Sequence, residues 1–278
     1  MIGRRWLGLA LSHGTLLAAV AFTAAPLVWL VSLSLQEPEA VFRYPPHFIP
    51  DQFRWRSYPE AWGSQPFARM YWNSVLTSTM IIAGQIVTSS LAAYALTQLR
   101  FRGRGLVFLF IISTMLVPIQ ATFIPAYIIL SRLHWINTYW ALIVPFVGSG
   151  FGVFLMRQAF LVVPPSLVDA ARIDGAGHWT ILTRILLPLA RPAVIALAAL
   201  SFVFHYNDFF WPLIVTNTSA MRTLPVGLAT MILTEGSKGT QWNHVMAADV
   251  FTVAPILVGF FFLQRYLVPT SLLSGGKS

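Results

Sequence analysis

The chain has 278 residues, of which 56% are hydrophobic and only 10% are charged, and its mean hydropathy is +0.69. This composition excludes an ordinary soluble domain and indicates a membrane protein. The net charge of +9 would suit a nucleic-acid partner in a soluble chain, but in a membrane chain its distribution between loops is a topology signal. No cysteine is present, which excludes a disulfide framework and thiolate chemistry.

Long apolar runs divide the sequence. A helix needs about 20 apolar residues to cross the hydrocarbon core. Longer stretches without any charged residue separate Arg5 from Glu37, Arg69 from Arg100, Arg104 from Arg132, and Arg132 from Arg157. Two later stretches, between Arg191 and Arg222 and between Lys238 and Arg265, each contain a single acid. The sequence therefore predicts an all-α integral membrane protein with six transmembrane helices.

The distribution of basic residues predicts the topology. Lys and Arg are more frequent on the side of the N-terminus than on the opposite side, so both termini are expected in the cytoplasm. Arg4 and Arg5 before an apolar run would also suit a secretory signal. The run continues to Leu35, beyond the roughly 7–15 residues of a signal core, which favours an uncleaved first helix.

The expected elements follow in chain order. The six spans are predicted at Leu7–Leu35, Tyr71–Leu99, Leu106–Leu130, Ile136–Phe160, Pro192–Val215 and Val245–Val268. Residues 1–70 then form the first helix and an outer interfacial segment, residues 71–268 form a core of five helices with a cytoplasmic loop at 161–191, and residues 269–278 form a cytoplasmic tail. Small and hydroxyl-bearing residues predict close packing of the second and fourth spans. The outer segment Thr216–His244 shows no clear period.

Polar residues inside the spans are candidates for a solute pathway. In the third span Pro118 and Pro125 flank Gln120 and Thr122, and a broken helix at membrane depth is tolerated where it is buried or lines a cavity. A pathway and a merely kinked helix both remain open. Asp208 lies roughly 25 Å along a helix from Arg191, near the outer surface, where it is an interfacial carboxylate or a solute ligand.

The main polar interruption runs from Pro164 to Pro188. Its two opening prolines end the fourth span, and Ser166 is the expected N-cap of a short helix, with Asp169 as its capping-box partner. Gly175 suits a left-handed C-terminal turn. A helix of about two turns is marginal alone in water, so we expect it to dock on another protein.

Enzymatic chemistry has no anchor in the sequence. The six histidines show no metal-ligand spacing, and no nucleophile, base and orienting residue can be grouped. The closing Gly275–Ser278 looks like the end of a phosphate loop, but the first glycine of that pattern would fall at Ser271 and no helix can follow. We therefore expect no catalytic residue, no metal site, and no cofactor in this chain.

The polar interruption resembles a known family. The order Asp169, Ala170, Ala171, Gly175, Ile185, Leu187, Pro188 matches the EAA signature of permease subunits of ABC importers, with Asp169 in place of the usual Glu. The context Ala170–Ala176, which includes Arg172 and Asp174, resembles the carbohydrate-uptake, MalG-like members. The motif Asn73-Ser74 and the pair Asn207-Asp208, which Tyr206 precedes, are similar to that family as well.

The resemblance implies a function. The chain would be a non-catalytic permease subunit in the prokaryotic plasma (inner) membrane, and its EAA coupling helix between spans four and five would lie in a cleft of a separate ATPase. Its partners would be a second permease subunit, two ATPase subunits that bind ATP and Mg, an extracytoplasmic substrate-binding protein and membrane lipid, with no nucleic acid. The solute would be a sugar or oligosaccharide, or alternatively sn-glycerol 3-phosphate or a glycerophosphodiester. The pathway candidates are Gln120, Thr122, Tyr206, Asn207 and Asp208. A stand-alone secondary transporter, with only Asp208 and Asp249 as intramembrane acids, is the alternative from another class.

Overall fold

A computed structural model describes residues 2–236 and 241–267, and over these residues the chain forms helices and no strand. The predicted tail, 269–278, lies outside the described residues. The chain divides into two compact units. A smaller unit comprises Met1–Phe67 and Gly227–Pro255, and a larger unit comprises Ala68–Val226 and Ile256–Ser278.

The described residues contain three helices that are long and apolar enough to cross a membrane by themselves. They are α1 (Ile2–Ser34), α3 (Phe67–Gln98) and α14 (Trp242–Leu267). Three bent helix pairs raise the number of candidate spans to as many as six if each pair is one span. The six apolar runs of the sequence therefore all correspond to helical segments, but three of them are interrupted.

The third apolar run is broken rather than gently kinked. It consists of α4 (Arg104–Ser113), a 3₁₀ turn η1 (Thr114–Leu116) and α5 (Ile119–Arg132), and the two parts meet at 98°. The break falls at Pro118, which lacks a backbone donor, while the preceding Val117 is extended with ψ 120° as a residue before proline prefers. Pro125 lies inside α5 without ending it.

The fourth apolar run consists of α6 (Tyr139–Ile143), a 3₁₀ turn η2 (Val144–Phe146) and α7 (Gly150–Val162). The run is bent by 45° between η2 and α7. Backbone carbonyls left free at such a bend need partners at membrane depth. Side chains of α3 supply them: Gln85 Nε2 donates to Phe146 O at 2.9 Å, and Thr88 Oγ1 donates to Val147 O at 2.7 Å.

Small residues bring these helices together as the sequence predicts. A Cβ on Gly152 would overlap the side chain of Ser89, and one on Gly84 would approach Val147 Cγ1 to 2.8 Å. A Cβ on Gly150 would lie 3.0 Å from Ile111 O. Gly148, by contrast, has open space around it. The packing therefore depends on particular glycines and not on small residues in general.

The fifth apolar run also differs from the predicted continuous helix Pro192–Val215. It is divided into α11 (Arg191–Tyr206) and α12 (Phe210–Val215). Upstream, α9 (His178–Thr180), a wide π-helical stretch η3 (Ile181–Leu186) and α10 (Leu187–Leu189) lead into α11 with a bend of 76°. The ring of Pro188 would clash with the carbonyl of residue 184 in a regular α-helix, which explains the wider turn before it.

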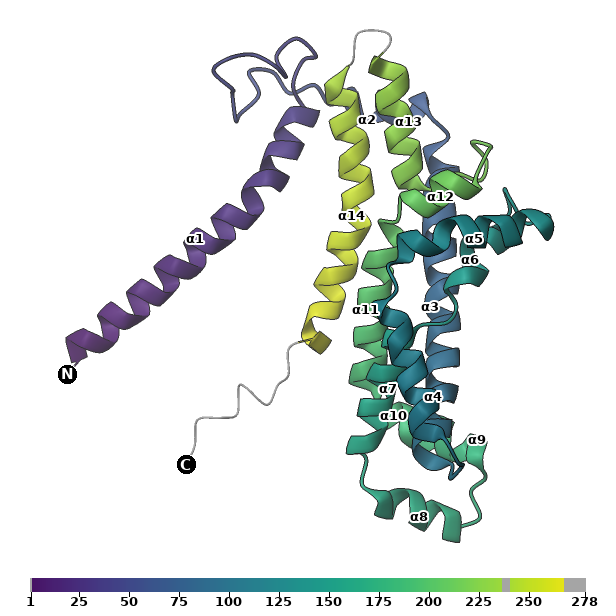
Figure 1. The fold of residues 1–278 in the computed structure, drawn as a ribbon. Helices are drawn as coiled ribbons and strands as arrows, with labels where there is room; N and C mark the ends of the chain where they lie inside the picture. Colours follow the sequence, from purple (N-terminus) through teal and green to yellow (C-terminus); the bar gives the residue numbers. More distant parts are fainter. Residues whose placement is uncertain (1, 237–240, 268–278) are drawn as a thin grey trace. The chain divides into compact units, whose positions relative to one another are not determined.

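Within the larger unit, α3, α4, α7 and α11 run side by side, and α8 (Pro165–Ile173) lies across one end of them (Figure 1). Where these helices meet α8 and η3, an apolar core forms around Tyr94, Phe160, Val168 and Leu186. A second core gathers around Trp211, whose Nε1 donates to Ala141 O at 2.9 Å.

Two polar residues, Asn73 and Ser74, fix the N-terminal part of α3 by hydrogen bonds. Asn73 is fully buried, donates to Ala220 O and Arg222 O at 2.9 Å each, and accepts from the hydroxyl of Tyr139. Ser74 Oγ accepts from the backbone N–H of Leu224 at 2.8 Å. Leu224 begins α13 (Leu224–Gly236). The sequence does not predict this helix, because the segment Thr216–His244 shows no clear hydrophobic period.

The smaller unit contains α1, the short α2 (Ser57–Ser64) and parts of α13 and α14. Glu60 of α2 accepts from His244 Nε2 at 2.9 Å and from Arg54 at 3.2 Å. The hydrogen bond from His244, together with Arg54, lowers the pKa of Glu60, and the hydrogen bond to Glu37 raises the pKa of Arg54. The irregular segment before α2 is thus held by ion pairs.

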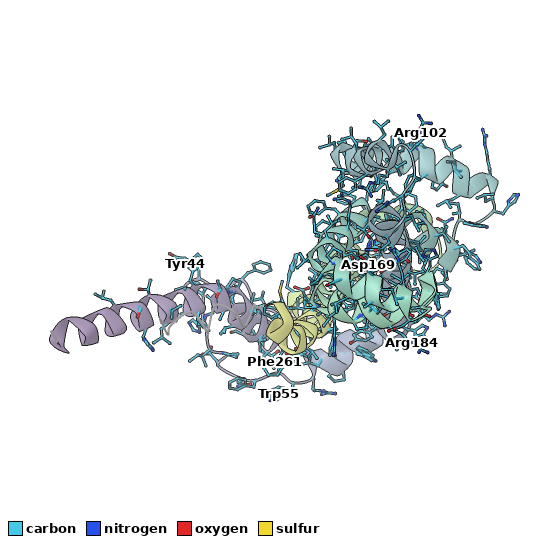
Figure 2. The ribbon with its side chains drawn as sticks, turned by 90° about the horizontal axis from the view of Figure 1, so that it is seen from below. Tyr44, Trp55, Arg102, Asp169, Arg184 and Phe261 are labelled. Carbon is cyan, nitrogen blue, oxygen red and sulfur yellow. The ribbon has the colours of Figure 1, made fainter. Side chains whose placement is uncertain are left out.

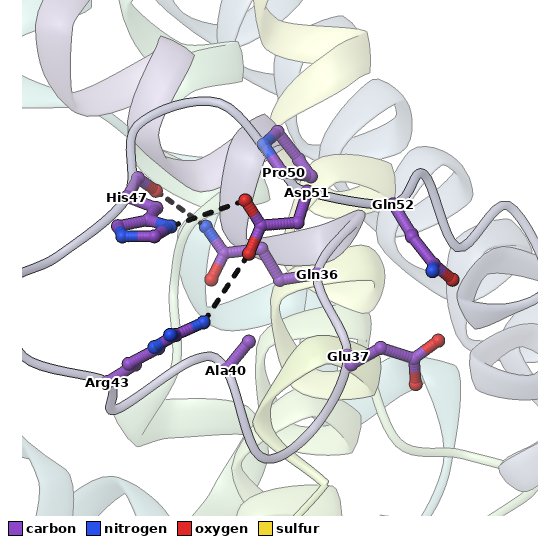
Figure 3. Close-up of a pocket in the computed structure, with 8 residues that line it drawn as sticks. All are labelled: Gln36, Glu37, Ala40, Arg43, His47, Pro50, Asp51 and Gln52. Atoms are coloured by element: carbon purple, nitrogen blue, oxygen red, sulfur yellow. Dashed lines mark hydrogen bonds and ion pairs between the residues drawn. The ribbon is translucent and has the colours of Figure 1, made fainter.

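The same segment surrounds a cavity of about 310 Å³ (Figure 3). Arg43 and His47 both approach the carboxylate of Asp51 at 3.5 Å, and Gln36 Nε2 donates to His47 O at 2.8 Å. These contacts hold residues 36–51, which lack regular secondary structure, in one conformation.

Candidate functional site

The helix predicted in the polar interruption is α8, Pro165–Ile173. Its C-terminus agrees with the prediction: Gly175 has a φ of +80°, its N–H donates to Arg172 O, and the N–H of Ala176 donates to Ala171 O at 2.9 Å. This is a Schellman arrangement, which satisfies the last carbonyls of the helix.

The start of α8 differs from the prediction. Ser166 is not the N-cap, because the helix begins at Pro165, with Pro164 as the cap and no side-chain cap bond. Proline suits the first helical position, since its fixed φ is preorganised and its missing N–H would have had no partner. The carboxylate of Asp169 therefore does not close a capping box but approaches Arg172 Nη1 at 3.4 Å.

The two sides of α8 differ in exposure. Val168 is 3% exposed and anchors the helix to the apolar core of the larger unit. In contrast, Ile173 is 86% exposed and Leu167 is 48% exposed. Exposed apolar side chains beside charged ones, on a helix too short to be stable alone, form a surface that is suited to a protein partner. We call Leu167, Asp169, Ala170, Arg172 and Ile173 the docking face.

Figure 2 views the protein from the end of the larger unit that carries α8. Asp169 lies in the foreground, with Arg102 and Arg184 on either side of it in this view. The ion pair between Asp169 and Arg172 is exposed, with side-chain exposures of 64% and 42%, so it contributes little to stability by itself. Both charges are thus available to a partner.

The predicted coupling residues fall into two groups. Ala171, Ile185 and Leu187 are partly buried and pack against the apolar core, so they position α8 instead of offering a contact surface. The exposed members are Asp169, Ala170, Arg172, Asp174, Gly175 and Pro188.

A polar contact that the sequence does not reveal joins the loop to α3. Tyr94 is 6% exposed, and its hydroxyl lies 2.7 Å from Nδ1 of His178, three residues after Gly175. The rings of Tyr94 and His178 also meet edge to face. Because α3 spans the larger unit from end to end (Figure 1), this contact connects the segment after α8 directly to a long helix.

The predicted pathway residues lie on two stretches of the larger unit, the first turn of α5 and the junction between α11 and α12. Gln120 and Thr122 are exposed on the first turn of α5, and the Thr122 hydroxyl donates to Ile119 O. Asn207 Nδ2 donates to Val203 O, and Asp208 Oδ1 accepts from the Trp211 N–H, so the pair marks the end of α11 and the start of α12. Tyr206 is 1% exposed, stacks on Phe202, and its hydroxyl has no partner among the described residues.

A cavity of about 430 Å³ lies in the larger unit, and Ile119 and His205, the sequence neighbours of Gln120 and Tyr206, line it. Its polar residues are Gln85 of α3, Ser149 before α7, and Ser201 and His205 of α11. Ser201 Oγ donates to Gln85 Oε1 at 2.6 Å, and Gln85 Nε2 lies 3.1 Å from His205 Nε2. A glutamine and a histidine inside apolar runs are a sequence signal, but only the structure shows that they meet. Among the described residues, no group of three His, Asp or Glu side chains could hold a metal ion.

The comparisons with known proteins agree with this architecture. A family model described as "Binding-protein-dependent transport system inner membrane component" matches residues 85–271. The chain belongs to this family, whose members are transport permease subunits of importers and not catalytic subunits. It is a multi-pass membrane protein.

Named relatives extend the likeness to most of the chain. The sn-glycerol-3-phosphate transport system permease protein UgpE of Yersinia pestis bv. Antiqua (strain Antiqua) is 35% identical over 92% of this chain and 93% of its own length. The arabinooligosaccharides transport system permease protein AraQ of Halalkalibacterium halodurans is 36% identical over 76% of each chain.

The fold has a solved counterpart. A chain of a bacterial ABC transporter involved in the import of the acidic polysaccharide alginate superposes with a TM-score of 0.83, at 24% identity, over 95% of this chain and 97% of its own. The arrangement of helices is therefore that of an ABC importer permease.

Proposed function

We propose that this chain forms half of the translocation pathway of an ATP-driven importer for a sugar or oligosaccharide, and that α8 couples it to the ATPase. The observation that carries the coupling role is the docking face, where Ile173 is 86% exposed next to the Asp169–Arg172 pair. The Schellman end at Gly175 and the buried Val168 hold this face in a fixed orientation, which suits the transmission of movement from a partner.

The coupling follows from rigidity. ATP-driven closure of two ATPase subunits would displace α8, and the displacement would reach α3 through the Tyr94–His178 contact and the apolar core on which Val168 of α8 packs. Packed helices move as rigid bodies. Their movement would therefore close the solute pathway to one face of the membrane and open it to the other. ATP and Mg belong to the ATPase, and no cofactor is assigned to this chain.

The same proposal includes the topology. Six spans with both termini in the cytoplasm would place α8 on the cytoplasmic side of a prokaryotic plasma (inner) membrane, and an extracytoplasmic binding protein would deliver the solute to the opposite side. Residues 1–70 would form the first helix with its outer segment, and residues 71–268 the permease core that pairs with a second permease subunit.

The docking face is tested with Ile173→Asp, since the side chain is exposed and its replacement leaves the fold intact. The expected result is normal membrane insertion with loss of co-purifying ATPase and of transport. The conservative Ile173→Leu serves as the matched control and retains both. Normal ATPase association and uptake in Ile173→Asp would contradict the assignment of α8 as the coupling helix.

A second solute class has a specific observation in its favour. The glycerol-phosphate permease matches 92% of this chain, whereas the arabinooligosaccharide permease matches 76%. Purification of the tagged chain with its complex, followed by mass spectrometry of the binding protein and its bound solute, separates the two. A carbohydrate supports the proposal, and sn-glycerol 3-phosphate replaces it with the alternative.

A further inference from the structure

The turn between α3 and α4 concentrates positive charge. We call Arg100, Arg102 and Arg104, which are all exposed, the arginine turn. Among the residues that the structure describes, these three side chains form no ion pair or hydrogen bond. The carboxylate of Asp169, in contrast, already faces Arg172. The arginine turn therefore offers uncompensated cations at the end of the larger unit that carries α8 (Figure 2).

The helix that follows the arginine turn has one face fixed to its neighbour. The guanidinium of Arg157 in α7 lies 4.2 Å from the ring centroid of Phe108, which is a cation–π contact. Gly150 at the start of α7 lies against Ile111 O. Phe108 and Ile111 are three residues apart and thus lie on the same face of α4. Because this face packs on α7, the rotation of α4 about its axis is fixed.

The opposite face of α4 is apolar and open. The spacing i, i+3, i+4 and i+7 places on one side of the helix the residues Leu106, Leu109, Phe110 and Ser113. Leu106 is 72% exposed, Leu109 is 63% exposed and Phe110 is 74% exposed. Together with Val107, these residues line a shallow hollow of about 600 Å³. We call it the α4 hollow, and it follows the arginine turn directly in the chain.

Cations next to an apolar hollow match the chemistry of an anionic phospholipid. Guanidinium groups bind phosphate oxygens through paired hydrogen bonds. Clusters of basic residues at the cytoplasmic end of a span attract anionic lipids. The charge alone is what the positive-inside rule places on a cytoplasmic loop. The α4 hollow adds a place for an acyl chain beside the phosphate, and this combination indicates a site for one lipid.

We propose that the arginine turn and the α4 hollow together bind one anionic phospholipid, with the phosphate on the arginines and an acyl chain along Leu106, Leu109 and Phe110. The lipid holds α4 at the membrane surface and, through the contact between Phe108 and Arg157, also α7, the helix that precedes α8. The proposal rests on the proposed topology, which puts the arginine turn in the cytoplasm.

A reporter in the hollow is available because the chain has no cysteine. A bimane fluorophore is attached to Ser113→Cys in the complete complex, whose other subunits carry no reactive cysteine. Nanodiscs of phosphatidylcholine contain a small fraction of phosphatidylglycerol or phosphatidylcholine with a spin label on the acyl chain, which quenches the fluorophore on contact. We expect stronger quenching by phosphatidylglycerol. At Ile129→Cys, an exposed position of α5 that does not line the hollow, the two lipids should quench equally.

Two matched pairs of variants, measured with the Ser113→Cys reporter, separate charge from shape. Arg102→Gln should lower the apparent affinity for phosphatidylglycerol about fivefold, as for the loss of one arginine at an anionic surface. Arg184→Gln removes the same charge on the other side of α8 in Figure 2 and should leave the affinity unchanged. Leu109→Trp fills the hollow and should lower the affinity although the arginine turn is intact. Ile129→Trp on α5 should not.

Equal quenching by the two lipids at Ser113→Cys would overturn the proposal, and so would equal affinities of Arg102→Gln and Arg184→Gln. Displacement of phosphatidylglycerol by excess inorganic phosphate would replace the lipid with a free phosphate. Loss of the second permease subunit from the Leu109→Trp complex would make the hollow a protein interface and would also overturn the proposal.

Failure of the proposed topology is recognised by a different measurement. Arg184→Cys is treated with a membrane-impermeant maleimide added outside intact spheroplasts. The proposed topology predicts no labelling before lysis and full labelling after it. Labelling before lysis would place this end of the larger unit outside the cell, whatever the outcome of the quenching experiment.

Discussion

The left-handed glycine at the end of α8 gives the sharpest prediction about coupling. Gly175 has a φ of +80°, and a Cβ added there would meet nothing within 4 Å. The cost of Gly175→Ala is therefore backbone strain alone, about 1–2 kcal/mol. A cost of that size shifts the ratio of ordered to frayed helix end roughly 5- to 30-fold. The two Schellman bonds that hold the docking face should weaken together.

The assay is ATP hydrolysis by the reconstituted complex with and without loaded binding protein. Gly175→Ala should reduce the stimulated rate while the amount of inserted protein is unchanged. Gly177→Ala is a matched control, because Gly177 has a φ of −73° and also has open space at its Cβ, so alanine fits there without strain. Gly175→Asn should lie between the two, since asparagine tolerates the left-handed region. Equal rates for Gly175→Ala and Gly177→Ala would refute the reasoning.

Three further predictions concern other contacts. Tyr94→Phe removes the hydroxyl that lies 2.7 Å from His178 and should lower the amount of solute transported per ATP. Tyr127→Phe changes an exposed tyrosine and should have no such effect. Equal losses in the two variants would contradict a role of the Tyr94–His178 contact in coupling. Gly152→Ala should destabilise the purified protein in a thermal melt because its Cβ would overlap Ser89, while Gly148→Ala should melt like the wild type. The pKa of Glu60 is lowered by its hydrogen bond from His244, so its stabilisation is complete above the ordinary value of 4.5 and is lost as the pH falls through the lowered pKa. Glu60→Gln should therefore flatten the fall of the melting temperature below pH 4.5, and an unchanged acid limb would count against this contact.

The length of an apolar run predicts where helices occur, because a helix must be long enough to cross the hydrocarbon core of the bilayer. The breaks are harder to locate from sequence. Pro118 and Pro125 flank the same polar pair, yet only Pro118 interrupts the helix. The bend before α7 depends on partners that come from α3, Gln85 and Thr88, and these are distant in sequence.

Local chemistry accounts for part of the site. Gly175 is predictable because a left-handed turn after a short helix favours glycine. The prediction of Ser166 as the N-cap is wrong because proline is favoured at the first helical position, and the helix therefore begins at Pro165. The start of α13 uses Ser74 of another helix as the partner of its first amide, so no periodicity within Thr216–His244 could reveal it. The His205 network likewise requires three segments to be brought together.

The central claim is that this chain transports solute only as part of an ATP-driven complex. Uptake into proteoliposomes tests it most directly, with the complete complex and the chain alone measured side by side. We predict that the complex accumulates the solute of its binding protein only when ATP and the ATPase are present, and that the chain alone accumulates nothing in a cation gradient. Accumulation by the chain alone would contradict the account and establish a secondary transporter.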